Sequence, residues 1–169
     1  MVPEDVDMNA LRADLAADNV AVYELGKQYP HLEPQLIDVS RHAETTGFGK
    51  TGIVVLDRTP QMPTDVRDIA QELLDTTGYD AIILRTPGTG SVVSRHHSRA
   101  ELESAQWHFL DEPDIAAGAR ELIDRCNEHF FPWAGINMVI GGLIVLAIAL
   151  AALGYLRQTR MHSTHKVSV

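Results

Sequence analysis

The stretch GIVVLDRTPQMPTDVRDIAQELLDTTGYDAIILRT, residues 52–86, decides the fold. Its two short β-branched runs, GIVVLD (52–57) and DAIILRT (80–86), predict buried strands. Between them, residues 64–77 predict a helix because apolar side chains recur at helical spacing, at Val66, Ile69, Ala70, Leu73 and Leu74. Gly78 is expected to end that helix. The short connections predict a parallel strand pair joined by a right-handed crossover.

The flanking sequence adds an edge strand and helices to this unit. PGTG (87–90) predicts a turn into an antiparallel edge strand, SVVS (91–94). Ser98 and Glu101 have the spacing of a capping box, which opens the next helix, and a last helix runs on towards residue 130. Before the strands, helices are expected over 7–17 and 34–45. The fold class is therefore α/β, with a small mixed sheet whose parallel strand–helix–strand core is flanked by helices.

A long uncharged run follows this domain. Residues 130–156 contain no Asp, Glu, Lys, Arg or His, and Trp133 and Tyr155 bracket the run. At about 1.5 Å rise per residue, 21 apolar residues span a hydrocarbon core of about 30 Å. We therefore expect three parts: an acidic, water-soluble domain over 1–131, one transmembrane helix from Pro132 to Leu156 in contact with the bilayer, and a short basic tail over 157–169.

Charge and cysteine content exclude some classes of function. All 23 acidic residues but only 11 of the 14 Lys and Arg residues lie in the domain, which gives the domain a net charge of −12. So acidic a domain argues against nucleic-acid binding, which needs Lys and Arg at phosphates. The single cysteine, Cys126, cannot form a disulfide within the chain and falls on the apolar spacing of its helix, so a core position is expected.

Three groups of residues are candidate sites. PGTGS (87–91) lacks the third glycine of a dinucleotide loop, because Val93 stands there. Asp57, Asp65 and Asp68 could approach one cation beyond the strand ends, near Arg85, although carboxylates also cap helices. The histidines His96, His97 and His108 lack zinc-site spacing and are expected to be exposed. No catalytic, cofactor-binding or metal-binding residue is therefore assigned, and no cofactor is predicted.

A family resemblance is carried by three stretches of sequence and the apolar C-terminal helix that follows them. The stretches are GIVVLDRTP (52–60), TDVRDIAQELLDTTGYDAIILRTPGTGSVVS (64–94) and SRAELESAQ (98–106). They resemble small actinobacterial single-pass membrane proteins, some of which are encoded beside NlpC/P60 cell-wall peptidases. The soluble part is similar to the TPM domain, a membrane-tethered α/β module. The resemblance covers about residues 51–156 and implies an assembly or accessory role. Some TPM relatives are linked to phosphatase activity or calcium binding.

The function expected from these features is that of a membrane-tethered, non-enzymatic accessory protein that binds a protein partner in a membrane or cell-envelope complex. A stripe of small residues, Ala147, Ala151 and Gly154, could contact a partner helix. The alternatives are a metal-dependent, phosphatase-like hydrolase and a calcium-binding membrane sensor. The acidic opening lacks the features of a signal peptide, so the domain is expected on the cytoplasmic side of the plasma membrane, with the extracytoplasmic side as the alternative.

Overall fold

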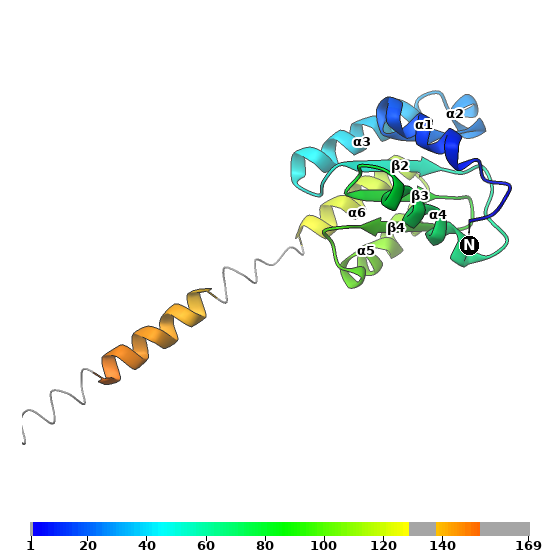
Figure 1. The fold of residues 1–169 in the computed structure, drawn as a ribbon. Coiled ribbons are helices and arrows are strands. Elements are labelled where there is room, and N and C mark those ends of the chain that lie inside the picture. Colours follow the sequence, from blue (N-terminus) through cyan, green and yellow to red (C-terminus); the bar gives the residue numbers. More distant parts are fainter. Residues whose placement is uncertain (1, 129–137, 153–169) are drawn as a thin grey trace, which may run out of the picture. The chain divides into compact units, whose positions relative to one another are not determined.

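The computed structural model describes residues 2–128 and 138–152 (Figure 1). The chain divides into two compact units, Met1–Phe130 and Phe131–Val169. The first unit contains six helices and four strands among its described residues: α1 (Met8–Asp18), β1 (Val20–Val22), α2 (Glu24–Gln28), α3 (Leu32–Thr46), β2 (Thr51–Val55), α4 (Pro63–Thr76), β3 (Ala81–Arg85), β4 (Gly90–Ser94), α5 (Arg99–Asp111) and α6 (Ile115–Glu128). It is an α/β domain, as the sequence predicts.

The four strands form one mixed sheet in the order β1-β2-β3-β4. β1, β2 and β3 are parallel, and β4 pairs antiparallel with β3. The predicted parallel pair and the predicted antiparallel edge strand are therefore confirmed. In this arrangement the carboxyl ends of three parallel strands meet at one edge of the sheet, where open α/β sheets bind ligands.

Helices cover both faces of the sheet (Figure 1). On one face, α3, α5 and α6 pack against alternate strand residues that include Ile53, Val55 and Ile83. On the other face, α1 and α4 pack against the intervening residues, such as Val54, Ile82 and Leu84. Strand side chains alternate between the two faces, so β2 and β3 read as continuous apolar runs because both of their faces are buried.

The two crossover connections have opposite hands. The parallel strands follow one another in space in chain order, yet α3 lies on one face of the sheet and α4 on the other. Two successive right-handed crossovers in the same direction would place both helices on the same face. One of the two crossovers is therefore left-handed, which is a rare arrangement.

Local sequence explains where the helices begin and end. The Asp7 carboxylate accepts hydrogen bonds from the backbone N–H groups of Asn9 and Ala10, both at 3.0 Å, and so begins α1. The predicted capping box at the start of α5 is confirmed, since Ser98 and Glu101 bond reciprocally. α3 ends at Gly47, whose φ of 89° is left-handed.

Two details of the sequence interpretation are wrong. β1 and α2 were not predicted, because an apolar strand of three residues and a helix of five residues carry little periodicity. Gly78 does not provide a left-handed helix end, because α4 already ends before Thr77, which is extended with a φ of −123° and a ψ of 171°.

The second unit has one described helix, over residues 138–152, whose side chains are exposed. The predicted transmembrane segment also includes residues 132–137 and 153–156, which lie outside the described residues, as does the predicted tail over 157–169. Of the small-residue stripe, Ala147 and Ala151 lie in the described helix and Gly154 lies beyond it. Among the described residues, no helix has the length and apolar character needed to cross a membrane.

Candidate functional site

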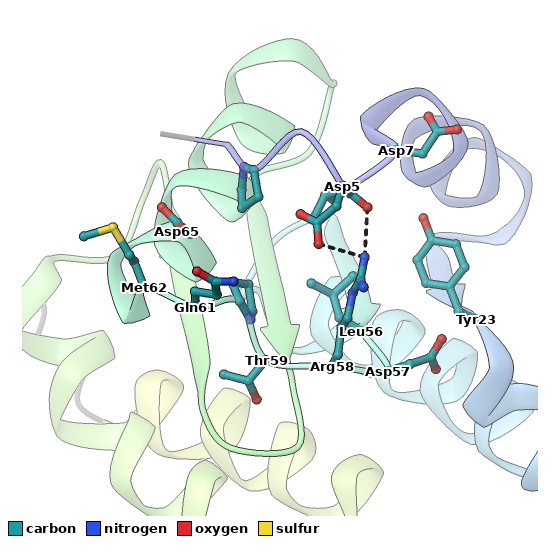
Figure 2. Close-up of a pocket in the computed structure, with 13 residues that line it drawn as sticks. Asp5, Asp7, Tyr23, Leu56, Asp57, Arg58, Thr59, Gln61, Met62 and Asp65 are labelled. Carbon is teal, nitrogen blue, oxygen red and sulfur yellow. Dashed lines mark hydrogen bonds and ion pairs between the residues drawn. The ribbon is translucent and has the colours of Figure 1, made fainter.

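A crevice of about 800 Å³ lies at the carboxyl ends of β1 and β2, and we call it the strand-end crevice (Figure 2). Three segments of chain form it: the N-terminal segment, the residue after β1, and the loop from β2 into α4. Its lining residues are Pro3, Asp5, Val6, Asp7, Tyr23, Leu56, Asp57, Arg58, Thr59, Pro60, Gln61, Met62 and Asp65. The chain reversal after each parallel strand brings these distant segments together.

Acidic side chains dominate the charge of the crevice. Four carboxylates line it, from Asp5, Asp7, Asp57 and Asp65, against one guanidinium, from Arg58. Figure 2 shows Arg58 reaching from the β2–α4 loop to the N-terminal segment, where it contacts the Asp5 carboxylate at 2.7 Å. Both partners of this ion pair are more than half exposed, so it contributes little to stability and another charged group can displace it.

Asp57 is a candidate cation ligand by sequence, and in the structure its carboxylate binds backbone N–H groups. One carboxylate oxygen accepts a hydrogen bond from the backbone N–H of Leu25 at 3.0 Å, and the other accepts one from Glu24 at 3.2 Å. The carboxylate thus ties the end of β2 to the first turn of α2, where negative charge is favoured. Within the described residues, no group of three or more His, Cys, Asp or Glu side chains could hold a metal ion.

Tyr23 gives the crevice a hydroxyl group beside its carboxylates. Partial burial raises the pKa of this phenol, and the nearby carboxylates of Asp14, Asp7 and Asp57 raise it further. The phenol is therefore protonated at neutral pH and can donate a hydrogen bond. Sequence reasoning missed Tyr23 because it missed β1, which positions it; the short apolar run VAV before it was the one available signal.

Thr59 lines the crevice and links it to the β3–β4 hairpin. PGTG forms a hairpin turn, as predicted, because Arg85 and Gly90 pair across it. The Thr59 hydroxyl lies 3.0 Å from the Thr86 hydroxyl and accepts a hydrogen bond from the Gly88 N–H at 2.9 Å. Arg85, at the end of β3, donates hydrogen bonds to the carbonyl oxygens of Phe109 and Leu110 at 2.9 Å, so it clamps α5 to the sheet.

The histidines are spread over different surroundings. His96 lies 3.1 Å from a carboxylate oxygen of Asp80 and is exposed, as expected, and His108 is also exposed. The expectation fails for His97, which is 9% exposed and stacks on Phe48 with 4.4 Å between ring centroids. Its ring fills a gap in the core, and this burial lowers its pKa.

Cys126 is a core residue, as its helical spacing predicts. It is buried on α6, and desolvation raises the pKa of its thiol to about 11. At neutral pH the side chain is therefore a thiol and not the nucleophilic thiolate.

With this geometry established, comparison with known proteins supplies the family. A family described as "Membrane protein Rv1476" matches residues 1–167. The chain belongs to this membrane protein family. It is 27% identical over 153 residues to "Membrane protein Rv1476" of Mycobacterium tuberculosis (strain ATCC 25618 / H37Rv), which covers 90% of this chain and 76% of the relative. No solved structure matches the chain.

Membership of this family confirms the expectation of an actinobacterial membrane protein. The family description names the membrane and gives no activity. The likeness to the TPM domain remains a prediction, and the part that the strand-end crevice plays is open to proposal.

Proposed function

We propose that the chain is a membrane-tethered, non-enzymatic accessory protein whose α/β domain binds a protein partner at the strand-end crevice. The observation that carries this proposal is the make-up of the crevice, in which four carboxylates stand beside apolar surface from Met62 and two prolines. Such a surface suits a segment that carries Lys or Arg next to apolar residues, since opposite charges give specificity and apolar burial gives affinity.

Two of the crevice carboxylates support the fold. Asp7 begins α1 and Asp57 begins α2 through hydrogen bonds to backbone N–H groups. A metal-dependent hydrolase would need carboxylates that converge on one ion. The resemblance to the TPM domain also supports an accessory role.

The tether in this proposal is the segment from Pro132 to Leu156, which would lie in the plasma membrane. Membership of a membrane protein family supports it. The stripe of Ala147, Ala151 and Gly154 would let a partner helix approach the tether closely. The domain would face the cytoplasm and the short basic tail would lie on the other side.

A charge change in the crevice tests the proposal. Met62 is 61% exposed and precedes α4 as its N-cap residue, but its side chain makes no capping hydrogen bond. Met62→Lys therefore adds a positive charge to the crevice without removing a cap hydrogen bond. The matched control is Thr45→Lys, which adds the same charge at an exposed site near the end of α3. Full-length protein is purified from its own cells in mild detergent, and co-purified proteins are identified by mass spectrometry.

We expect a partner that co-purifies with the wild type and with Thr45→Lys and is depleted with Met62→Lys. Equal recovery with all three proteins would contradict binding at the crevice.

A second experiment tests for enzymatic activity, in which the purified protein is assayed with p-nitrophenyl phosphate and Mg²⁺, Mn²⁺ or Ca²⁺. Turnover that depends on the metal ion and is lost in Asp57→Asn, which keeps one oxygen acceptor for the helix, would overturn the non-enzymatic role.

A further inference from the structure

The outer edge of the sheet has free backbone groups. Among the residues that the structure describes, β4 pairs with β3 alone, so it is an edge strand. In an antiparallel pair, alternate residues exchange hydrogen bonds with the neighbouring strand. The bonds from Thr86 N to Thr89 O and from Arg95 N to Asp80 O, both 2.8 Å, fix the phase of this alternation. Ser91 and Val93 therefore bond to β3, and the N–H and C=O of Val92 point outward.

A groove runs along this edge, and we call it the β4 edge groove. It has a volume of about 370 Å³ and lies between α4 and α5, with Arg67 and Gln71 on one wall and Arg99 and Gln106 on the other. Its floor is recessed, because Ser91, Val92 and Val93 are 8, 6 and 4% exposed. A five-residue strand is about 17 Å long, so the floor can align a short extended segment.

A side chain already occupies one bonding position on this edge. The Gln106 side-chain amide donates a hydrogen bond to the outward carbonyl of Gly90 at 3.2 Å. That amide takes the place that a backbone N–H of a neighbouring strand would occupy. Within the described part of the chain, no such donor or acceptor meets the outward groups of Val92. The edge is thus partly blunted, as native sheet edges usually are, but not closed.

The groove differs in charge from the rest of the domain. The domain has a net charge of −12, yet the groove is lined by Arg67, Arg99 and Glu103, which sum to +1. Arg99 and Glu103 form an exposed ion pair one turn apart on α5. Arg67 is exposed and has no ion pair among the described residues. A carboxylate on a bound segment could therefore form an ion pair with Arg67.

His97 adds a second unmet polar group to the lining. Its ring is nine-tenths buried against Phe48, and its Nδ1 has no hydrogen-bond partner within the described residues.

We propose that the β4 edge groove binds an extended segment of another protein, which carries an acidic side chain opposite Arg67 and joins the sheet as a fifth strand. A second copy of this chain fits less well. Its own β4 is recessed between the same two helices, and two recessed edges cannot come within the roughly 5 Å of paired strands. This proposal is independent of the strand-end crevice, which takes a segment of opposite charge at another edge of the sheet.

The test uses the full chain in nanodiscs. A phage-displayed library of random peptides about eight residues long is selected on the wild type, with empty nanodiscs to remove background. The strongest peptides are synthesised, and their affinities are measured by fluorescence anisotropy. Val92→Pro removes the outward N–H without breaking the bonds to β3, because proline is tolerated on a free edge. Arg67→Glu reverses the charge on the wall, and Arg41→Glu, at an exposed position of α3, is its matched control.

We expect selected peptides in which Asp or Glu alternates with β-branched residues. Their binding should be lost in Val92→Pro, weakened about fivefold or more in Arg67→Glu, as expected for an exposed ion pair, and unchanged in Arg41→Glu. If Val92→Pro unfolds the domain, the comparison of Arg67→Glu with Arg41→Glu tests the proposal by itself. No enrichment over empty nanodiscs, or equal binding by Arg67→Glu and Arg41→Glu, overturns the proposal. Concentration-dependent dimers lost in Arg67→Glu overturn it in favour of a second copy.

Discussion

Asp57 shows how one carboxylate can be committed to structure at a position where ligands often bind. It follows β2 at the carboxyl edge of the sheet, and both of its oxygens hold the first turn of α2. Loss of such a cap costs about 1 kcal/mol. Replacement by alanine would therefore disturb α2 whether or not the residue had a further role. Asp57→Asn separates the two effects, because the amide oxygen still accepts a hydrogen bond.

The burial of His97 leads to a prediction about how the stability of the domain depends on pH. Burial lowers its pKa in the folded domain below the unfolded value of 6.5, with Glu101 and His96 as nearby charged groups. Below pH 6.5 the unfolded chain binds a proton that the folded domain binds less readily, so the free energy of unfolding falls as the pH falls. We expect His97→Phe to reduce the drop in melting temperature between pH 7.5 and pH 5.

The control for this experiment is His108→Phe, at an exposed histidine on α5. It should keep the pH dependence of the wild type. If His97→Phe lost as much melting temperature between the two pH values as the wild type does, the buried ring would not be the source of the effect. Sequence reasoning placed this histidine on the surface because its contact with Phe48, 49 residues earlier in the chain, has no signal in the local pattern.

At the scale of elements, the sequence predicted correctly those helices and strands whose local pattern is strong. α4 has five apolar residues at helical spacing, and all five are buried. α5 was fixed by its capping box. β1 and α2 were missed because three and five residues carry too little periodicity, and they form through contacts with β2 and Asp57. The sequence pointed to the carboxyl edge of β2 through Asp57 and Asp65, which line the strand-end crevice, but it missed the wall that Tyr23 provides after β1.

The register of α4 has a direct test. Leu73 is fully buried between α4 and the sheet, in the cluster that contains Ile82 and Leu84. Leu73→Asp places an unpaired charge in this core at a cost of several kcal/mol, against a usual domain stability of about 5–15 kcal/mol. We expect the domain to unfold, as measured by circular dichroism and urea titration. Gln71→Asp, two residues away on the partly exposed side, should stay folded. A wild-type melting curve for Leu73→Asp would contradict the register.

At the scale of the whole molecule, charge separates the two ends of the chain. The domain carries a net charge of −12, and the residues after 156 carry three basic residues and no acidic ones. Sequence composition predicted this division, and the resemblance of the stretches within residues 52–106 predicted an actinobacterial membrane protein family. Composition could not predict the two surfaces on which the proposals rest, because each surface joins segments that tertiary folding brings together.

Sidedness is the last prediction, and two features of the chain oppose each other. The α/β domain is synthesised before the apolar segment and forms its own core, which favours a domain on the cytoplasmic side. Basic residues near the proposed tether, three after it against Arg120 and Arg125 before it, favour the reverse by one residue. We expect the first feature to prevail, because a folded domain resists translocation more than one charge directs it.

Cysteine labelling of whole cells with a membrane-impermeant maleimide decides between them. Cys126→Ser removes the native thiol from the background. Ser168→Cys then reports on the tail, outside the described residues, and Ala117→Cys reports on an exposed position of α6. Labelling of Ser168→Cys in intact cells, with Ala117→Cys labelled only after lysis, is the expected result. The opposite pattern would place the domain outside the cytoplasm, and both proposed partners would then have to be sought among envelope proteins.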